Sequence, residues 1–472
     1  MSRGAAWAPM VVAASAAVLS GCYSMAPAYE RPVAPVAANF PVGALPAKGT
    51  AAIDSAADLA WTQFFADARL KRLIELALAN NRDLRIAVRN IEQARALVDA
   101  RRADQLPTWN AGLSEARATK TGGGIGSSYS AGVLVTAYEA DLFGRVRSLS
   151  EAAAAQWLAT DEARKAVQIS LVANVANTHL ALLGDDELLG ITQQTLASRE
   201  DSLRLTRLKF DHGATSLLDL RQAESLLEAA RATLAQATRQ RALDENALVL
   251  LLGQPLPAEL PAAQALTGQL AAAELPAGLP SDLLERRPDV RQAEQLLIGA
   301  NANIGAARAA FFPRITLTGS LGSASSALDG LFRAGSFGWS IAPQLLQPIF
   351  DAGRNEANLK IARAGRDIAA AQYERAVQSA FREVADALAG RATLGEQLAA
   401  QQAQLRAEQD RAQLTDLRYR NGASSYLEVL DAQRSLFATQ QAVVQLQTQR
   451  VQNLVTLYRV LGGGWTASDG LR

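Results

Sequence analysis

The two halves of this chain repeat each other in sequence, and this duplication limits the fold more than any other feature. Residues 205–216 (LTRLKFDHGATS) match residues 414–425 (LTDLRYRNGASS), and the match continues without a gap to Leu252 and Leu461. The offset is 209 residues here and 206 residues in an upstream block that ends at the two equivalent prolines. A single duplication with a small change in length explains both values. We therefore expect two repeats with the same secondary structure, 61–265 and 266–472.

Each repeat contains long segments that lack helix-breaking residues. Residues 145–211 and 355–421 contain no proline, and the segments that follow them, 214–252 and 423–461, contain neither proline nor glycine. These stretches predict helices of roughly 60–100 Å within 145–252 and 355–461, far longer than ordinary globular helices. Apolar residues spaced three and four apart predict a coiled-coil seam on the second helix of each pair. They are Leu220, Ala223, Leu227, Ala230, Leu234 and Ala237, and then Val429, Ala432, Leu436, Thr439, Val443 and Leu446.

Four shorter segments alternate apolar with small or polar residues, which is the period of a strand. Two lie within about 107–140 and two within about 313–346, and Gly-rich connections join each pair into a hairpin. Each segment is close to the roughly 9 to 11 residues that cross a bilayer as a tilted strand. The alternative is two exposed hairpins packed on a soluble domain.

Four strands cannot close a barrel, and open strand edges in lipid leave backbone groups unpaired. A membrane-spanning chain of this kind must therefore oligomerise. Two copies would give eight strands, whose interior side chains largely fill, whereas three copies would give twelve strands and an open lumen.

The N-terminus is typical of an exported protein. Residues 1–21 combine Arg3 with an apolar run of signal-peptide length, which is too short to span a bilayer as a helix. The run ends in LSGC, which resembles the bacterial lipobox and makes Cys22, the single cysteine of the chain, a candidate for acylation. The alternative is a buried core cysteine. We expect a lipidated, Pro-rich tether over 22–60, and no further apolar stretch long enough for a transmembrane helix.

The composition excludes several classes of function. The chain has 47 Lys and Arg against 46 Asp and Glu, which gives a net charge of +1 and argues against a nucleic-acid-binding protein. The two histidines, His179 and His212, and the single cysteine make a metal site improbable. No phosphate-binding loop occurs, and no nucleophile motif accompanies the acidic pair Glu139 and Asp141. We expect no enzyme activity, metal or cofactor.

Four local motifs accompany the duplicated plan: YEADLFGR (138–145), LLERRPDV (283–290), FDAGR (350–354) and the segment from Tyr419 to Arg434. Their order and spacing resemble those of the TolC-like outer-membrane efflux proteins, closest to the lipoprotein branch that contains OprM and NodT. The resemblance implies a homotrimer, with a twelve-stranded outer-membrane β-barrel built from four strands per chain. A long periplasmic α-helical coiled-coil barrel would continue it, so that the fold is mainly α with membrane β.

The turns between the long helices carry the candidate functional residues. Gly213 and Gly422 suit the left-handed conformation that ends a helix, and Ser216 and Ser425 have the S-x-x-acid spacing that caps the next one. By resemblance, these turns are the tips that dock a periplasmic adaptor. The expected docking residues are Gly213, Thr215, Ser216, Gly422, Ser424 and Ser425.

A periplasmic gate is also implied by the resemblance, at Leu427, Asp431 and Arg434. Their spacings of four and three residues place all three on one helical face. Leu427 would be an apolar plug, and Asp431 and Arg434 would form charge pairs around the threefold axis. The first repeat has Leu218, Gln222 and Ser225 at the equivalent positions, so we expect the second repeat to form most of the gate.

The favoured function is a passive outer-membrane exit duct of a tripartite efflux pump. By resemblance, a periplasmic adaptor and an inner-membrane pump of RND type would deliver drugs or other small solutes to it. The duct would be lipid-anchored in the outer membrane and extend into the periplasm. The alternatives are the duct of a type I protein secretion system, a periplasmic coiled-coil scaffold and a periplasmic hydrolase.

Overall fold

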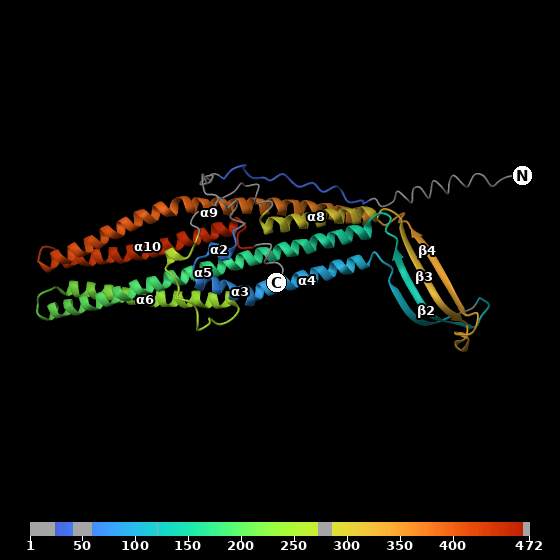
Figure 1. Cartoon of the computed structure of the whole chain (residues 1–472), viewed down its shortest axis with the longest axis horizontal. Coiled ribbons are helices and arrows are strands. Elements are labelled where there is room, and N and C mark those ends of the chain that lie inside the picture. The colour runs from blue at the N-terminus through green and yellow to red at the C-terminus, as the bar shows by residue number, and fades with distance from the viewer. Residues whose placement is uncertain (1–23, 41–58, 120, 272–285, 466–472) are drawn as a thin grey trace. The chain divides into compact units, whose positions relative to one another are not determined.

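The described residues of the computed structural model form long helices and one antiparallel sheet (Figure 1). They cover 24–40, 59–119, 121–271 and 286–465. The expected signal segment 1–21 and Cys22 lie outside them. In chain order the main elements are α2 (Trp61–Phe64), α3 (Ala68–Asn80), α4 (Arg82–Ala103), β1 (Trp109–Thr119), β2 (Ile125–Glu139), α5 (Arg145–Asp211), α6 (Leu217–Leu252), α8 (Pro288–Ala309), β3 (Arg314–Ser325), β4 (Phe337–Leu346), α9 (Arg354–Arg420) and α10 (Tyr426–Val460).

The helices reproduce the duplication seen in the sequence. Helices α5 and α9 both contain 67 residues, and their first residues, Arg145 and Arg354, are separated by the same 209 positions as the repeat. Helices α6 and α10 contain 36 and 35 residues. The internal two-fold repeat and the mainly helical fold class are confirmed.

The chain divides into two compact units. The described residues within Met1–Ala34, Arg89–Glu162 and Gln292–Arg375 form one unit, which we call the sheet unit because it contains all four strands. Those within Pro35–Val88, Ala163–Arg291 and Ala376–Arg472 form the other, the turn unit, which contains both turns between the long helices. Both repeats contribute to both units, so the units do not follow the repeats.

Burial confirms most of the seam expected on α6 and α10. Ten of the twelve seam residues are buried, and Leu234 and Leu436 are partly buried. Near the turns the seam joins the two helices in one apolar cluster, because Ala223 and Leu226 of α6 pack with Tyr426, Val429 and Leu430 of α10. The three-and-four spacing therefore locates the faces that bury against neighbouring helices.

Helix α5 corrects one expectation about membrane spans. It contains an 18-residue window with a mean hydropathy of 1.4, apolar enough to cross a bilayer by composition, although we expected no such stretch after the N-terminus. More than half of that window, 56%, is buried inside the protein. Its apolarity is that of a core helix, since Val175, Ala176 and Leu180 are completely buried.

The four strands form one sheet in the order β1-β2-β3-β4, with every neighbouring pair antiparallel. The hairpins β1–β2 and β3–β4 therefore meet along β2 and β3, with Gly132 opposite Gly322. The outer strands β1 and β4 are exposed along their whole lengths. Each presents one backbone edge that no other described strand pairs with, which is the open arrangement expected of four strands.

A β-bulge interrupts the pairing of β2 with β3. The register shifts between Val135 and Tyr138, where Ala137 has a positive φ of 51°. The extra residue moves Tyr138 to the face that carries Val135 and turns Glu139 to the opposite face. The alternation expected within 107–140 is therefore wrong beyond Val135, because the period of two does not hold across a bulge.

The carboxylate of Glu139, the last residue of β2, forms ion pairs with two arginines. It accepts two hydrogen bonds from Arg145 at the start of α5, at 2.8 and 2.7 Å, and contacts Arg314 at the start of β3 at 2.7 Å. Arg145 and Arg314 come from different repeats. The acidic pair of the sequence therefore includes a structural carboxylate that ties both repeats together within the sheet unit.

Residues 24–34, part of the expected tether, are hydrogen-bonded to α8. Arg31 donates two hydrogen bonds to Glu294, at 2.7 and 3.0 Å, and the Tyr29 hydroxyl donates a third at 3.0 Å. Asn301 donates to the Pro27 carbonyl at 2.7 Å. The prolines of this segment prevent regular helix but leave its carbonyls available for such contacts.

The core of the turn unit packs around an aromatic cluster. Phe64 stacks on Tyr458 of α10 with ring centroids 4.0 Å apart, and both side chains are almost completely buried. Arg287, also buried, lies just before α8 and donates to Asp289, Glu383 and the Val460 carbonyl at the end of α10. Pro288 is the first residue of α8, a position that suits proline because the N–H it lacks would have no partner within the helix.

Candidate functional site

The two faces of the sheet differ in chemistry. Directly opposite residues of antiparallel strands point to the same face, so the register groups Ala111, Val133, Leu321 and Trp339 on one face. Trp109, Val135 and Ile341 share that face, which also forms an apolar hollow of about 430 Å³. Several of its large side chains are exposed, Trp339 by 73%. An exposed apolar band of this kind suits contact with lipid.

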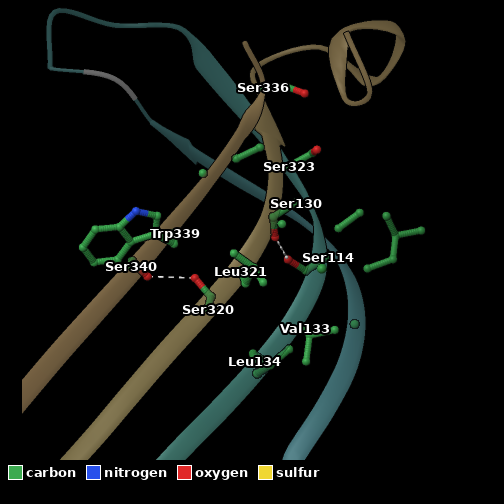
Figure 2. A pocket seen from close by; sticks show the side chains of 17 residues that line it. Ser114, Ser130, Val133, Leu134, Ser320, Leu321, Ser323, Ser336, Trp339 and Ser340 are labelled. Atoms are coloured by element: carbon green, nitrogen blue, oxygen red, sulfur yellow. Dashed lines mark hydrogen bonds between the residues drawn. The ribbon is translucent and has the colours of Figure 1, made fainter. Parts of the chain in front are cut away.

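The opposite face carries mostly small and hydroxyl side chains, with Leu134 as a larger apolar exception. Figure 2 shows the cleft of about 570 Å³ above it, where Ser114 and Ser130 are hydrogen-bonded across β1 and β2 at 2.7 Å. Ser320 and Ser340 form the same pair across β3 and β4, also at 2.7 Å. A polar face with little bulk suits a water-filled interior.

A row of glycines crosses this polar face. Gly112, Gly132, Gly322 and Gly338 lie opposite one another on the four strands. A Cβ on Gly132 would lie 2.7 Å from Gly322 Cα and would also collide with the Leu321 carbonyl oxygen. Only glycine permits β2 and β3 to approach this closely.

The turns between the long helices have the local geometry that the sequence predicts. Gly213 and Gly422 have φ values of 71° and 74°. In the first turn, the Gly213 and Ala214 amides donate to the carbonyls of Phe210 and Lys209, at 2.9 and 2.7 Å, which is a Schellman motif. The second turn repeats this pattern at Gly422 and Ala423.

Both following helices begin with a complete capping box. Ser216 caps α6 with Asp219 as the returning acid, and Ser425 caps α10 with Glu428. Hydrogen bonds from Ser216 and Thr215 lower the pKa of Asp219, because they favour its ionised form. The Ser424 hydroxyl is buried and has no hydrogen-bond partner among the described residues. These contacts explain the turn residues structurally and leave their outer surfaces exposed.

The two turns lie side by side and are joined through Tyr426 (Figure 1). Its hydroxyl is 2.7 Å from Ser202 Oγ, and Thr206 donates to it at 3.1 Å. Lys209 of α5 donates to the Tyr419 hydroxyl of α9 at 3.0 Å. A tyrosine anchor at the start of α10 therefore binds the second helical hairpin to the first.

Leu427, Asp431 and Arg434 lie on α10 as expected, but among the described residues no ion pair joins Asp431 to Arg434 within the protomer. Asp431 instead forms an ion pair with Arg411 of α9, which also contacts Glu408 at 3.2 Å. Leu427 is 56% exposed in the protomer. Sequence reasoning missed Arg411, although it and Asp431 lie at similar distances along the chain on either side of Gly422.

The equivalent positions of the first repeat form no charge pair of this kind. Leu218 is exposed like Leu427, whereas the Gln222 side-chain oxygen is buried without a partner among the described residues. The repeats therefore share their turns and exposed leucines and differ in the charges behind them.

A second polar feature lies farther along α5. Burial raises the pKa of Asp185 to about 7, and a hydrogen bond and charge repulsion from Asp244 of α6 act in the same direction. Asp186 adds to the increase, and Arg241 opposes it. The carboxyl lines a cleft of about 490 Å³ between α5, α6 and α10 whose other polar side chains are glutamines and threonines.

This carboxyl predicts a pH-dependent stability. Because its folded-state pKa lies above its ordinary value, its favourable contribution is complete at acidic pH and is lost as the pH rises through about 7. Asp185→Asn, which imitates the protonated carboxyl, is expected to raise Tm more at pH 8 than at pH 5. Scanning fluorimetry of the detergent-solubilised protein measures this. Asp201→Asn, at an exposed position of the same helix, is the control; an equal change in Tm at both pH values for Asp185→Asn would contradict the prediction.

An open four-stranded sheet with an apolar face and a polar face, joined to long helical hairpins, is the plan of an outer-membrane channel subunit. Comparison with known proteins agrees. The family model described as "Outer membrane efflux protein" matches residues 73–254 and 279–463, once in each repeat.

Curated relatives and solved structures match nearly the whole chain. The solvent efflux pump outer membrane protein SrpC of Pseudomonas putida is 48% identical over 460 residues, which cover 96% of this chain and 97% of SrpC. Outer membrane protein OprJ of Pseudomonas aeruginosa is 46% identical over 463 residues, 96% of each chain. The open-state crystal structure of the Neisseria gonorrhoeae MtrE channel is 41% identical, covers 94% of this chain and 98% of MtrE, and has a TM-score of 0.85.

The chain belongs to the outer membrane efflux protein family. It is an outer-membrane exit duct of the kind used by efflux pumps, and it extends into the periplasm. This confirms the expected family, fold class, general function and location. The family is one of channel proteins, and among the described residues no group of three or more His, Cys, Asp or Glu is arranged to hold a metal ion.

Proposed function

We propose that three copies of this chain form the duct, with β4 of each copy pairing with β1 of the next. The observation that carries this proposal is the sheet itself, whose two free edges belong to exposed strands of 10 and 11 residues. Edge pairing between copies would satisfy backbone groups that lipid cannot. Twelve strands would then enclose the serine and glycine face and leave the tryptophan face toward lipid.

The duct is passive and receives its cargo from an inner-membrane pump, of RND type, through a periplasmic adaptor. The paired turns support this assignment, because they combine rigid caps with exposed leucines at equivalent positions of both repeats, Leu218 and Leu427. We assign adaptor docking to Gly213, Thr215, Ser216, Gly422, Ser424 and Ser425. We assign the periplasmic gate to Leu427, Asp431 and Arg434, with Arg411 holding Asp431 when the gate pairs are absent.

The proposed cargo is small and apolar or amphipathic, as for drugs and organic solvents. Relatives named for solvent efflux and for antibiotic efflux support this class of cargo. Their names also favour efflux over the type I secretion alternative. The serine-lined face would let solutes pass without a charged selectivity ring.

The anchoring of the duct is proposed from the sequence. Residues 1–21 would be removed as a signal, Cys22 would be acylated, and residues 22–60 would link the lipid to the repeats 61–265 and 266–472. The hydrogen bonds of Arg31 and Tyr29 to Glu294 support this, because they would transmit the position of the anchor to α8.

Two measurements test the exit-duct proposal. The purified protein is expected to migrate as a trimer and to produce discrete conductance steps in planar bilayers. In a strain that lacks its own efflux duct, expression together with the cognate adaptor and pump is expected to restore tolerance to toluene. A purified trimer that never conducts would refute the pore, and conductance without restored tolerance would refute the proposed cargo.

A further inference from the structure

Arg199 of α5 is a buried cation without a counterion. Its residue exposure is 6%, and its Nε is buried with no hydrogen-bond partner among the described residues. Its Nη1 donates a hydrogen bond to the Leu226 carbonyl of α6, at 2.8 Å. The guanidinium carbon lies 5.2 Å from the centre of the Phe437 ring of α10. A ring face and a carbonyl oxygen compensate a buried positive charge only in part.

A second cation acts on Arg199 electrostatically. Burial lowers the pKa of Arg199, and the positive charge of Arg434 lowers it further. Among the described residues, no acidic side chain forms an ion pair with either arginine. The nearest candidates along the chain are already engaged, since Asp431 pairs with Arg411 and Glu200 pairs with Arg231. Within the protomer the two arginines therefore repel each other, and neither forms an ion pair with a described acidic residue.

The cleft beside Arg199 is lined by hydrogen-bond donors. It has a volume of about 170 Å³ and lies between α5 and α10. Its polar lining consists of Arg199, Gln194, Thr195, Ser198, Gln433 and Gln440, and it includes no carboxylate. Amide and hydroxyl groups can all turn a donor toward a bound anion. The remaining walls, Ile191, Leu436 and Phe437, are apolar and would strengthen the attraction by excluding water.

The sequence repeat shows that this charge is particular to the first half. Arg199 corresponds to Glu408 in the second repeat, which is paired with Arg411 at 3.2 Å. Arg434 corresponds to Ser225. The duplication has therefore placed an unpaired arginine where its copy holds a paired glutamate.

We propose that the cleft between α5 and α10 binds a small monovalent anion, a halide or a carboxylate group, beside the Arg199 guanidinium. The anion supplies the negative charge that Arg199 lacks within the protomer and joins the first helical hairpin to the second. The site stands independently of the duct function, because binding can be measured on the solubilised protein without recording conductance.

Bromide is the probe, because it replaces chloride and can be located by anomalous scattering. In detergent at constant ionic strength, sodium gluconate is replaced stepwise by sodium bromide up to about 100 mM while Tm is recorded. A ligand that binds only the folded protein is expected to raise Tm with increasing concentration. Arg199→Gln and Arg434→Gln are expected to remove more than about half of the halide-specific shift, since each removes one attracting charge. Arg204→Gln, at an exposed position of α5, is the matched control and is expected to keep it.

Crystals grown in bromide separate the possible sources of the negative charge. An anomalous peak within hydrogen-bonding reach of the Arg199 guanidinium, absent in Arg434→Gln, supports a free anion. If the density instead belongs to an acidic side chain of a second copy, the proposal of a free anion is wrong and the negative charge comes from an interface between copies. The absence of any peak, or an equal bromide shift in all four proteins, would overturn the site. If Arg199→Gln does not assemble, Arg434→Gln carries the comparison, because Arg434 is exposed.

Discussion

Replacing both Asp431 and Arg434 with alanine is expected to leave the channel open for most of a planar-bilayer recording. The two residues lie one turn apart on α10, and in a trimer their copies would meet around the threefold axis. The closed fraction is expected to fall by roughly tenfold. Each exposed pair stabilises the closed state only weakly, but the trimer contains three equivalent pairs and their free energies add. Single-channel recording at fixed voltage and salt measures the closed fraction directly.

A second exposed pair provides the control for the gate. Arg420 and Asp416 form an ion pair at 2.8 Å on the last turn of α9, close to the same end of the hairpin. Removing both charges there is expected to leave the closed fraction unchanged. If the closed fraction of the Asp431 and Arg434 double variant equals that of the unmodified channel, these residues are solvated helix charges and the gate lies elsewhere.

Gly132→Ala is expected to block assembly of the duct in the outer membrane. The added Cβ would lie 2.7 Å from Gly322 Cα, where backbone cannot move aside as a flexible side chain can. Overpacking of this kind costs about 1–3 kcal/mol per site, and three copies of β2 would incur it in one barrel. The yield of heat-modifiable trimer in outer-membrane fractions is expected to fall severalfold.

Gly319→Ala is the matched control for this substitution. It lies on β3 of the same sheet, but its Cβ would only make an ordinary contact of 3.6 Å with the Ser340 carbonyl oxygen. We expect normal amounts of trimer from it. Equal yields from the two alanine variants would show that β2 and β3 separate easily, and the glycine row would lose its structural explanation.

The features that depend on neighbouring residues could be predicted from the sequence. Gly213 and Gly422 end their helices, and Ser216 and Ser425 begin the next ones, because these interactions span only a few residues. The faces of the strands followed from the period of two as far as Val135. Beyond Val135, the bulge at Ala137 places Glu139 on the other face. No local sequence pattern predicts that extra residue.

Contacts between distant segments could not be predicted in this way. Arg411 lies on a different helix from its partner Asp431, and Arg287 reaches both α9 and α10. The prolines of the N-terminal segment exclude helix and indicate a tether. They do not indicate that Arg31 donates a hydrogen bond to Glu294, more than two hundred residues later. The unpaired state of Arg199 is also a property of the packed helices, since its residue type alone indicates only a surface charge.

The sequence by itself determined the repeat, the long helices, the turn chemistry and the membership of the family, because each is encoded by short-range spacing or by motif order. Only the tertiary structure decided which charges are paired, where the strands shift register and where glycines let two strands approach closely. Those features depend on which segments the chain brings together, and burial then determines whether a charge must find a partner. The same residue type, arginine, is therefore a structural clamp at Arg287, a partner of the proposed gate at Arg411 and an unpaired buried cation at Arg199.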